Sequence, residues 1–203
     1  MNRTRLLLVR HAPTTATRTF RFPADEPLDD DGRQAASCLA GTLQAGHAVT
    51  SPAIRCRDTA ALAGFLDAAI DPDLAELDFG AWAGRDIGDV ERGSATALAF
   101  WYADPTRAPH GGETLDELAT RISRAIDRLR DQPGTTVAFT HGGPIKVAIL
   151  HALGAPLRAI WRIDVTPCHV TELHPRPHGG WAVARANAAL VSQATTAARS
   201  LPQ

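Results

Sequence analysis

Two short apolar runs in this chain each end at a histidine. Residues 6–9 (LLLV) lead directly into Arg10 and His11, and residues 134–140 (GTTVAFT) lead into His141. The unbroken apolar run at residues 6–9 predicts a strand that is buried on both faces of a sheet. The β-branched and apolar residues of the second run predict another strand. Because ligands bind at the carboxyl ends of strands in open α/β sheets, we expect the two histidines to face each other across one crevice.

Helical patterns separate these strands, which gives the chain an α/β order. Thr114 and Glu117 form a capping-box pattern that opens a helix ending near Arg130. Four other segments predict helices from their apolar spacing and start signals, at residues 31–45, 53–66, 89–101 and 144–153. Extended segments are expected at residues 47–50 and 71–84, and a closing hairpin at residues 168–175 and 180–188.

The length of the chain favours a single domain. A chain of 203 residues with 44% hydrophobic residues is long enough for one well-packed core and short for two. We therefore expect one domain over residues 1–190. Residues 191–203 are small and polar, so we expect a disordered tail, with a final helix docking on a neighbour as the alternative.

The composition excludes several classes of partner. The 21 basic and 22 acidic residues give a formal charge of -1, so no long-range field favours nucleic acid or an anionic membrane. Cys38, Cys56 and Cys168 lack the spacing of a zinc site or a disulfide framework, which fits a reducing cytoplasm. No apolar run approaches the roughly 18 residues of a membrane span. Any affinity for anions must therefore be local.

Arg10 and His11 form the first candidate site. On a regular strand these neighbours point to opposite faces, so a turn at Ala12 and Pro13 is needed to bring both to one ligand. A neutral imidazole is a nucleophile near neutral pH when one nitrogen donates to a fixed acceptor and the other is free. An adjacent guanidinium can bind the equatorial oxygens of a phosphoryl group. Taken alone, such a pair is more often structural than catalytic.

Three further stretches carry groups of the same kind. Arg55, in SPAIRCRDTA, lies on the first turn of a helix, where backbone N–H groups favour an anion. Glu76, in AELDFGAWAG, stands beside aromatic residues, and a half-buried carboxyl there could keep the proton that a general acid needs. His141 and Gly142, in FTHGGPIK, add a histidine and glycine amides at a helix N-terminus. An exposed arginine and a loop carboxylate are the alternative interpretations of Arg55 and Glu76.

In this order, the motifs resemble those of the histidine phosphatase superfamily, whose members have the phosphoglycerate mutase-like fold. The similarity extends over LLLVRHAPT, PLDDDGRQAA, SPAIRCRDTA, ELDFGAWAG, HGGETLDELATRI and VAFTHGGPIKVAIL, which together span nearly the whole chain. The resemblance implies a three-layer α/β sandwich with a mostly parallel central sheet flanked by helices. It also implies a reaction through phosphohistidine that needs no metal or other cofactor.

The resemblance assigns a role to each candidate residue. His11 is the phosphorylated nucleophile, and Glu76 is the proton donor to the leaving oxygen. The phosphate is held by Arg10, Arg55, a cationic His141 and the backbone amide of Gly142. Phosphoryl transfer depends mainly on positioning and on charge balance at the equatorial oxygens, which these groups supply.

The chain departs from the family pattern in several places. Ala12 replaces the glycine that usually follows the motif histidine, Pro13 replaces an acidic residue, and the usual WEG is WAG with Ala83. Thr17 replaces a common asparagine and can still donate one hydrogen bond to phosphate. His110, in APHGGET, resembles a family loop over the pocket and could contact the leaving group, with a solvated loop histidine as the more common case.

The expected activity is that of a phosphatase acting on a small phosphorylated metabolite. Family mutases usually carry longer insertions, and the segments FWYADPTRAPHGGET and IWRIDVTPCHVTEL are most similar to α-ribazole phosphatase-like members. The candidate substrates are therefore α-ribazole phosphate or a sugar phosphate. A phosphoglycerate mutase-type phosphotransferase and a catalytically weak phosphate-binding regulatory module remain open, as does assembly into a homodimer.

Overall fold

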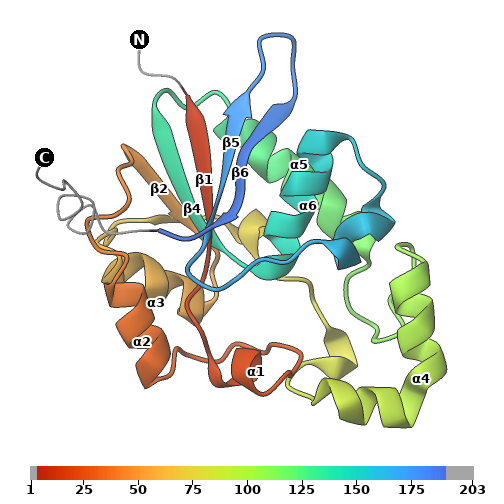
Figure 1. Cartoon of the computed structure of the whole chain (residues 1–203). Helices are drawn as coiled ribbons and strands as arrows, with labels where there is room; N and C mark the ends of the chain where they lie inside the picture. Colours follow the sequence, from red (N-terminus) through yellow and green to blue (C-terminus); the bar gives the residue numbers. More distant parts are fainter. Residues whose placement is uncertain (1–3, 191–203) are drawn as a thin grey trace, which may run out of the picture.

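The structure is a computed structural model that describes residues 4–190, and its centre is a six-stranded sheet with helices on both faces (Figure 1). The strands are β1 (Arg5–Arg10), β2 (His47–Thr50), β3 (Ala69–Ile70), β4 (Thr135–Thr140), β5 (Val170–Pro175) and β6 (Trp181–Ala188). Their order across the sheet is β3-β2-β4-β1-β5-β6. The tail expected at residues 191–203 lies outside the described residues.

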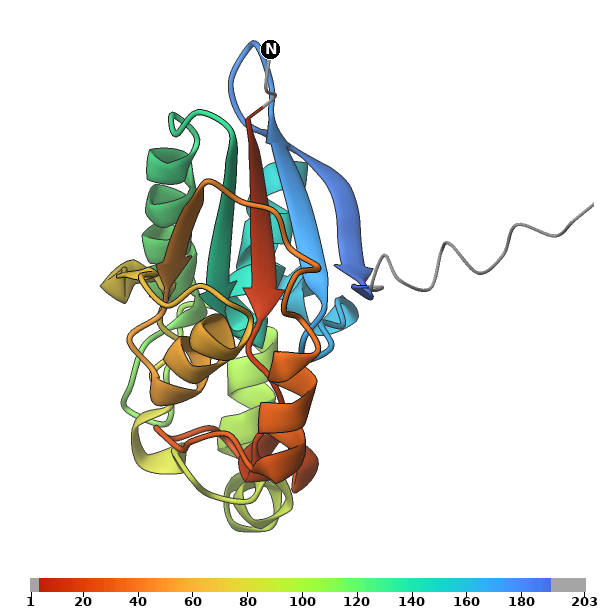
Figure 2. The ribbon, with the colours of Figure 1, turned by 90° about the vertical axis from the view of Figure 1, so that its left-hand side faces the viewer.

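The sheet is mostly parallel. β1 pairs parallel with β4, and β2 pairs parallel with both β3 and β4. β5 pairs antiparallel with β1 and then with β6, which forms the closing hairpin predicted from the sequence. β1 and β4 point toward the end of the molecule where the α1 and α4 helices lie (Figure 2). The predicted α/β sandwich with a mostly parallel sheet is thus confirmed.

The helices form the two outer layers and the region beyond the strand ends. They are α1 (Thr15–Arg18), α2 (Asp30–Ser37), α3 (Ile54–Leu62), α4 (Ile87–Ala103), α5 (Leu115–Leu129) and α6 (Gly142–Leu153). Three short 3-10 turns accompany them, η1 (Pro72–Leu74), η2 (Gly80–Trp82) and η3 (Leu157–Arg162). α2 and α3 lie on one side of the sheet, and α5 and α6 on the other (Figure 1).

β1 contributes alternate side chains to two separate cores. Leu6 and Leu8 belong to a large cluster with residues of α5 and α6, whereas Leu7 and Val9 pack in a second cluster with residues of α3. A strand buried in this way on both faces explains why β1 has a continuous apolar sequence without polar alternation. The two covering layers bury the middle of the strand, so that Arg10 at its carboxyl end is one of the residues left to line a cavity.

Two helices end earlier than the sequence predicts. The pattern at residues 31–45 predicts one helix, but α2 ends at Ser37. The pattern at residues 53–66 predicts another, but α3 ends at Leu62. Turns follow in both places, and they contain Gly41 and Gly64 with φ angles of 74° and 96°. Glycine adopts this left-handed conformation without the steric cost of a side chain, and it commonly ends helices.

The segment at residues 71–84, expected to be extended, forms η1 and η2 instead. Asp71 caps η1 by accepting a hydrogen bond from the Asp73 N–H, and Pro72 occupies the first position of the turn. Both residue types favour the start of a helical turn, which the prediction overlooked. The residues between the two turns, which include Glu76, remain without regular structure.

Within residues 4–190, none of the helices combines the length and the apolar character that a membrane crossing requires.

Gly32 allows α2 to approach the loop that follows β1. A Cβ atom at this position would lie 2.0 Å from the carbonyl oxygen of Pro13, which is far inside a normal contact. The same helix start is capped by Asp29, whose carboxylate accepts a hydrogen bond from the Gly32 N–H at 2.8 Å. α2 therefore packs directly on the backbone that leads away from His11.

We expect a Gly32→Ala variant to lose about 1–3 kcal/mol of unfolding free energy, because the added methyl group must displace the helix or the loop. Urea unfolding measures this change. The matched control is Gly46→Ala, since a Cβ there meets no atom within 4 Å, and we expect its effect to stay within about 0.5 kcal/mol. Equal stabilities for the two variants would show that the approach of α2 to Pro13 is not tight in solution.

Candidate active site

The carboxyl ends of β1 and β4 place His11 and His141 beside each other. The register pairs Arg10 with Thr140, so each histidine is the first residue after its strand. Their ring centroids lie 5.1 Å apart, and their exposed fractions are only 3% and 0%. The backbone N–H of His11 also donates to the Thr140 carbonyl oxygen at 2.9 Å, which fixes the backbone where the chain leaves the sheet. The two histidines predicted to share one crevice do lie together.

The hydrogen bonds of His11 define its tautomer. Nδ1 lies 2.7 Å from the Ala12 carbonyl oxygen, and Nε2 lies 3.3 Å from Nε of Arg55. Because a guanidinium group only donates, Nε2 must be the acceptor and Nδ1 must carry the proton. Burial holds the pKa of His11 well below its usual value, and the charges of Arg55 and Arg10 lower it further. His11 is therefore a neutral imidazole with a lone pair on Nε2.

Arg55 lies in the first turn of α3 and connects the two histidines. In addition to its bond to His11, its Nη2 donates to Nδ1 of His141 at 3.1 Å, and its Nη1 donates to the Ala24 carbonyl oxygen at 2.6 Å. The carboxylate of Glu26 lies 3.9 Å from Nη1, and that of Asp25 lies 4.0 Å away. This side chain is a structural part of the site, and the alternative of an exposed helix arginine is wrong.

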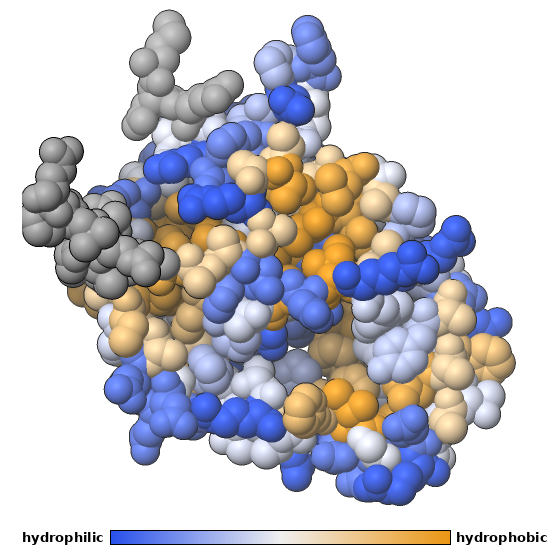
Figure 3. All heavy atoms as spheres, in the orientation of Figure 1, coloured by the Kyte–Doolittle hydropathy of each residue, from blue (hydrophilic) through white to orange (hydrophobic). Residues whose placement is uncertain are grey.

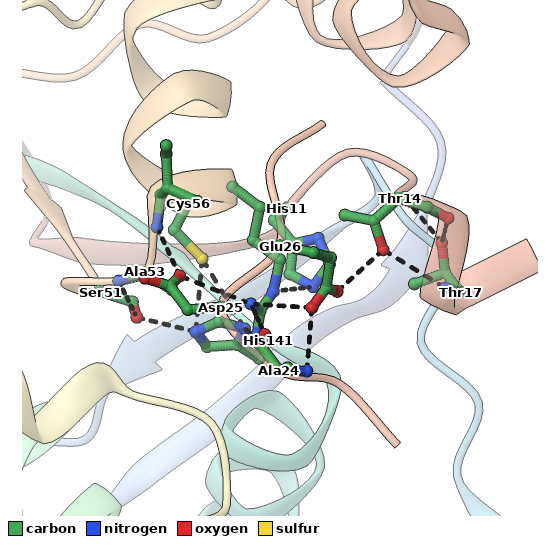
Figure 4. A network of polar contacts seen from close by, with 12 residues as sticks. His11, Thr14, Thr17, Ala24, Asp25, Glu26, Ser51, Ala53, Cys56 and His141 are labelled. Carbon is green, nitrogen blue, oxygen red and sulfur yellow. Dashed lines mark hydrogen bonds and ion pairs between the residues drawn. The ribbon is translucent and has the colours of Figure 1, made fainter. Parts of the chain in front are cut away.

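His141 is also neutral, which differs from the cationic form that the family resemblance implies. Its Nδ1 accepts from Arg55, so Nε2 carries the proton and donates to the Ser51 hydroxyl at 2.7 Å. Burial holds the pKa of His141 well below its usual value, with further lowering by His11 and Arg55. Figure 4 shows His11, His141 and Ser51 within this one polar network.

Arg10 offers a donor that no protein atom satisfies. Its Nη1 donates to the Val165 carbonyl oxygen, but its Nε is buried and has no hydrogen-bond partner among the described residues. Gly142 lies directly beside it, since a Cβ on this glycine would be 3.6 Å from Nε. A buried donor of this kind is costly unless a ligand accepts its hydrogen bond. Arg10 therefore favours an anion at the start of α6.

Glu76 lies between two cavities of the site. One cavity, of about 330 Å³, is lined by Arg55 and His141, and the other, of about 600 Å³, is lined by Arg10 and Gly142. Glu76 borders both, so the structure brings the predicted residues of four separate motifs together. Its Oε2 lies 3.4 Å from the Gly143 nitrogen, and a Cβ on Gly143 would be 2.3 Å from Oε1. Glycine at this position is therefore what admits the carboxylate to the start of α6.

Arg121 of α5 holds the backbone of the Glu76 segment in place. Its guanidinium group donates to both carboxylate oxygens of Glu113, at 2.9 and 2.7 Å. The same group donates to the carbonyl oxygens of Asp73, Ala75 and Glu76, at 2.7, 3.0 and 3.3 Å. Glu76 thus lies in a segment without regular structure. Arg121, which is itself paired with Glu113, holds the backbone of this segment in place.

The sequence analysis missed Arg121, and it gave no role to Ser51 or Glu26. Ser51 is the first residue after β2, so its position at a strand end was a usable signal. Glu26 accepts hydrogen bonds from the Thr14 hydroxyl and the Ala24 N–H, in a loop whose sequence shows no pattern. Arg121 becomes important only through contacts with residues more than 40 positions away in the chain.

Two of the predicted phosphate or substrate contacts, Thr17 and His110, lie outside the cluster around His11 and His141. The Thr17 hydroxyl donates to the Thr14 carbonyl oxygen at 2.7 Å and accepts from the Thr14 N–H, as part of the capping box of α1. Its side chain is therefore used inside the helix start, away from the histidines (Figure 4). The alternative of a solvated His110 is wrong, because this side chain is 3% exposed and packs against Trp82, with ring centroids 5.0 Å apart. Its buried Nε2 has no hydrogen-bond partner among the described residues, and its ring lies 6.1 Å from Phe79 and 6.0 Å from Trp101, which line the larger cavity. Contact of His110 with the leaving group stays a prediction.

This arrangement is suited to a tetrahedral oxyanion. Guanidinium groups and the start of α6 line two cavities that both border Glu76, and donors of this type bind phosphate without a metal ion. The unprotonated Nε2 of His11, which accepts a hydrogen bond from Arg55 in this structure, can act as a nucleophile once Arg55 turns to an anion. The neighbouring carboxyl group of Glu76 can exchange a proton with a departing or attacking oxygen.

Comparison with known proteins identifies the family and several relatives of this chain. The sequence model of the histidine phosphatase superfamily (branch 1) matches residues 6–189. A bifunctional protein of Mycobacterium tuberculosis is 32% identical over 184 residues, which are 84% of this chain and 50% of that protein. This chain thus spans about half the length of that relative.

Two phosphatases are also similar over most of their length. An adenosylcobalamin/alpha-ribazole phosphatase of Escherichia coli is 29% identical over 175 residues, covering 79% of this chain and 85% of that enzyme. The solved structure of a mycobacterial glucosyl-3-phosphoglycerate phosphatase, a complex with VO3, has 26% identity and a TM-score of 0.80. The match covers 91% of this chain and 99% of that one.

An Arg55→Met variant should bind inorganic phosphate roughly 10- to 100-fold more weakly, because hydrogen bonds to charged groups contribute about 1.5–3 kcal/mol. Isothermal titration calorimetry with inorganic phosphate measures this loss. Arg57→Met is the matched control, since Arg57 lies on the same helix but is exposed, and its affinity should stay unchanged. Equal affinities for both variants would exclude Arg55 from the anion site.

Proposed function

The chain belongs to the histidine phosphatase superfamily, and from this premise we propose that it hydrolyses a small phosphomonoester through a phosphohistidine intermediate on His11. The proposal rests above all on one observation. A buried, neutral imidazole presents its Nε2 lone pair to the guanidinium group of Arg55, while its Nδ1–H is fixed on the Ala12 carbonyl oxygen. A nucleophile in this state needs no deprotonation before it attacks phosphorus.

In the first step, Nε2 of His11 attacks the phosphorus atom in line with the ester oxygen. The P–O ester bond breaks as the N–P bond forms, and Glu76 donates its proton to the departing oxygen, which leaves as the alcohol. The Nδ1–H stays hydrogen-bonded to Ala12, so the positive charge that develops on the phosphorylated ring is stabilised by a carbonyl dipole. Arg10 and Arg55 balance the charge on the equatorial oxygens.

In the second step, water attacks the phosphorus of the phosphohistidine. The Glu76 carboxylate takes a proton from this water as the N–P bond breaks. Inorganic phosphate is released, and His11 returns to its original neutral form. Glu76 is then protonated again and ready for the next ester. Each group therefore returns to its starting state, and the protein supplies the charges that the reaction requires.

His141 takes part through a change of partner. In the structure its Nδ1 accepts from Arg55, and a bound phosphoryl group would attract the same guanidinium nitrogen. An adjacent anion also favours the charged form of an imidazole. We propose that His141 becomes a cationic donor only when the phosphoryl group is present, which agrees with the role implied by the family.

The similar proteins favour a phosphatase and guide the choice of substrate. One is a phosphatase of α-ribazole and another of glucosyl-3-phosphoglycerate. We therefore propose α-ribazole phosphate or a sugar phosphate as substrates to test first. The departures at Ala12, Pro13 and Ala83 lie beside the site motifs and leave the assigned groups in place.

The direct test is phosphoenzyme trapping during turnover of p-nitrophenyl phosphate. The wild-type chain should hydrolyse this ester and show the mass of one phosphoryl group on the peptide that contains His11. A His11→Ala variant should lose both signals, with turnover falling by roughly a thousandfold or more because the nucleophile is gone.

His178→Ala is the matched control, since His178 is exposed in the turn between β5 and β6. It should hydrolyse the ester at the wild-type rate and be labelled on His11. A wild-type chain that turns over without a labelled histidine, or a His11→Ala variant that keeps substantial activity, would refute the proposed function.

A Glu76→Gln variant tests the proton donor. We expect kcat/KM for an alkyl phosphate to fall by about 10²- to 10⁴-fold, because the alkoxide cannot leave easily without a proton. p-Nitrophenyl phosphate should lose far less, since p-nitrophenolate leaves without protonation. Glu91→Gln, at an exposed position of α4, is the control. A uniform loss for both esters would assign Glu76 another role.

A further inference from the structure

The larger cavity of the site extends away from the histidines and has an apolar wall. Its volume is about 600 Å³, which lies in the range of small-molecule pockets. Beyond Arg10 and Glu76, its lining includes apolar residues of α4, α5 and η3, among them Trp101, Tyr102, Leu118, Ile160 and Trp161. Figure 3 shows a hollow on this face of the molecule, with hydrophobic side chains around much of its rim.

The aromatic part of this wall is held in a fixed shape. The ring of Trp161 lies with its centroid 4.7 Å from those of both Trp101 and Tyr102, in edge-to-face arrangements. The Trp161 indole N–H donates to the Tyr102 carbonyl oxygen at 3.0 Å, which connects η3 to α4. Trp161 and Tyr102 nevertheless remain 37% and 41% exposed. Flat apolar surface is thus presented to solvent beside the site by side chains that cannot easily turn away.

The polar groups of the cavity do not select a charged ligand. Lys146 and Asp164 both line it, so one cation accompanies one anion. Burial lowers the pKa of Lys146, and the nearby Asp164 opposes that shift. Among leucine and isoleucine side chains, a sugar hydroxyl would lose hydrogen bonds to water without a replacement, which costs free energy. An apolar ring would gain free energy at the same place.

The position of Glu76 connects this cavity to the reaction. Glu76 borders both the cavity with Arg55 and His141 and the larger apolar one. Under the proposed function, the ester oxygen lies beside its carboxyl group, and the phosphoryl group lies on the guanidinium side. Glu76 also borders a third cavity of about 590 Å³, which is lined by Asp78, Glu113 and Arg121 and contains neither Arg10 nor Arg55. The larger apolar cavity does contain Arg10 and the start of α6, so we place the alcohol part of the substrate there.

We propose that the larger cavity is a leaving-group site for phosphomonoesters whose alcohol carries a planar apolar ring. This inference rests on the proposed function, because it assigns the cavity to the alcohol that departs from phosphorus. It selects among the substrates of that reaction: aryl-substituted or heteroaryl-substituted alcohols are favoured, and short polar or strongly anionic alcohols are not.

Benzyl phosphate and methyl phosphate are the matched substrates, because their alcohols have similar acidity and differ in the ring. We expect kcat/KM of the wild-type chain to be about 10- to 100-fold higher for benzyl phosphate, as burial of one aromatic ring implies. Glycerol 1-phosphate, which is larger than methyl phosphate but polar, should not gain this advantage. Initial rates of phosphate release measure all three esters.

A Trp161→Ala variant should narrow the ratio of benzyl to methyl phosphate to within about threefold, because the ring loses its stacking surface. Trp161 is partly exposed, so the variant should fold. Phe100→Ala is the matched control, since Phe100 is an exposed aromatic residue of α4 outside the cavity lining. It should keep the wild-type ratio.

Binding provides a second readout that does not depend on turnover. Competitive inhibition of p-nitrophenyl phosphate hydrolysis should be about 10-fold or more stronger for benzylphosphonate than for methylphosphonate. Hydrolysis of both esters at equal kcat/KM, with equal inhibition by both phosphonates, would overturn the leaving-group site and leave the proposed function standing. No hydrolysis of any ester, p-nitrophenyl phosphate included, would overturn the proposed function and this inference with it.

Discussion

The parallel pairing of β1 with β4 is the constraint on which the site depends. Because Arg10 lies opposite Thr140, the residues that follow, His11 and His141, leave the sheet side by side. β2 occupies the other side of β4, and the backbone N–H of Ser51, the first residue after β2, donates to the Phe139 carbonyl oxygen. The start of α3 therefore arrives beside the same two rings. A shift of one residue in either register would turn these side chains to opposite faces of the sheet.

Burial then determines the protonation of the groups that the strands bring together. Two guanidinium groups and two imidazoles in one buried place would repel each other if all were charged. The low pKa values of His11 and His141 remove two of these charges, and the guanidinium group of Arg55 donates to both neutral rings. The carboxylates of Asp25 and Glu26 lie within 4.0 Å of Arg55. The resulting site favours an anion, and the Nε2 atom of His11 already carries no proton.

The sequence predicted the parts of the site that depend on local rules and failed where distant segments meet. His11 and His141 were identifiable because strand ends and helix starts have clear sequence patterns. The burial of His110 was not predictable from local rules, because its loop crosses the turn at residues 78–80 at very short range. A Cβ on Gly80 would lie 2.2 Å from the His110 carbonyl oxygen, and this crossing draws the ring among the aromatic residues. Thr17 failed for a local reason, since its short side chain completes a capping box with Thr14. No sequence pattern around Arg121 indicates that it holds the Glu76 segment, because the residues of that segment are distant in the chain.

In the absence of substrate, we infer that His11 is held as a neutral imidazole whose unprotonated Nε2 accepts a hydrogen bond from Arg55. The ¹⁵N chemical shifts of the His11 ring in the free protein test this directly, followed from pH 7.5 to 5.5. The account predicts a protonated Nδ1 and an unprotonated Nε2 throughout this range, because burial and the two arginines lower the pKa well below the ordinary value of about 6.5. A ring that becomes doubly protonated near pH 6.5, or that carries its proton on Nε2, would contradict it.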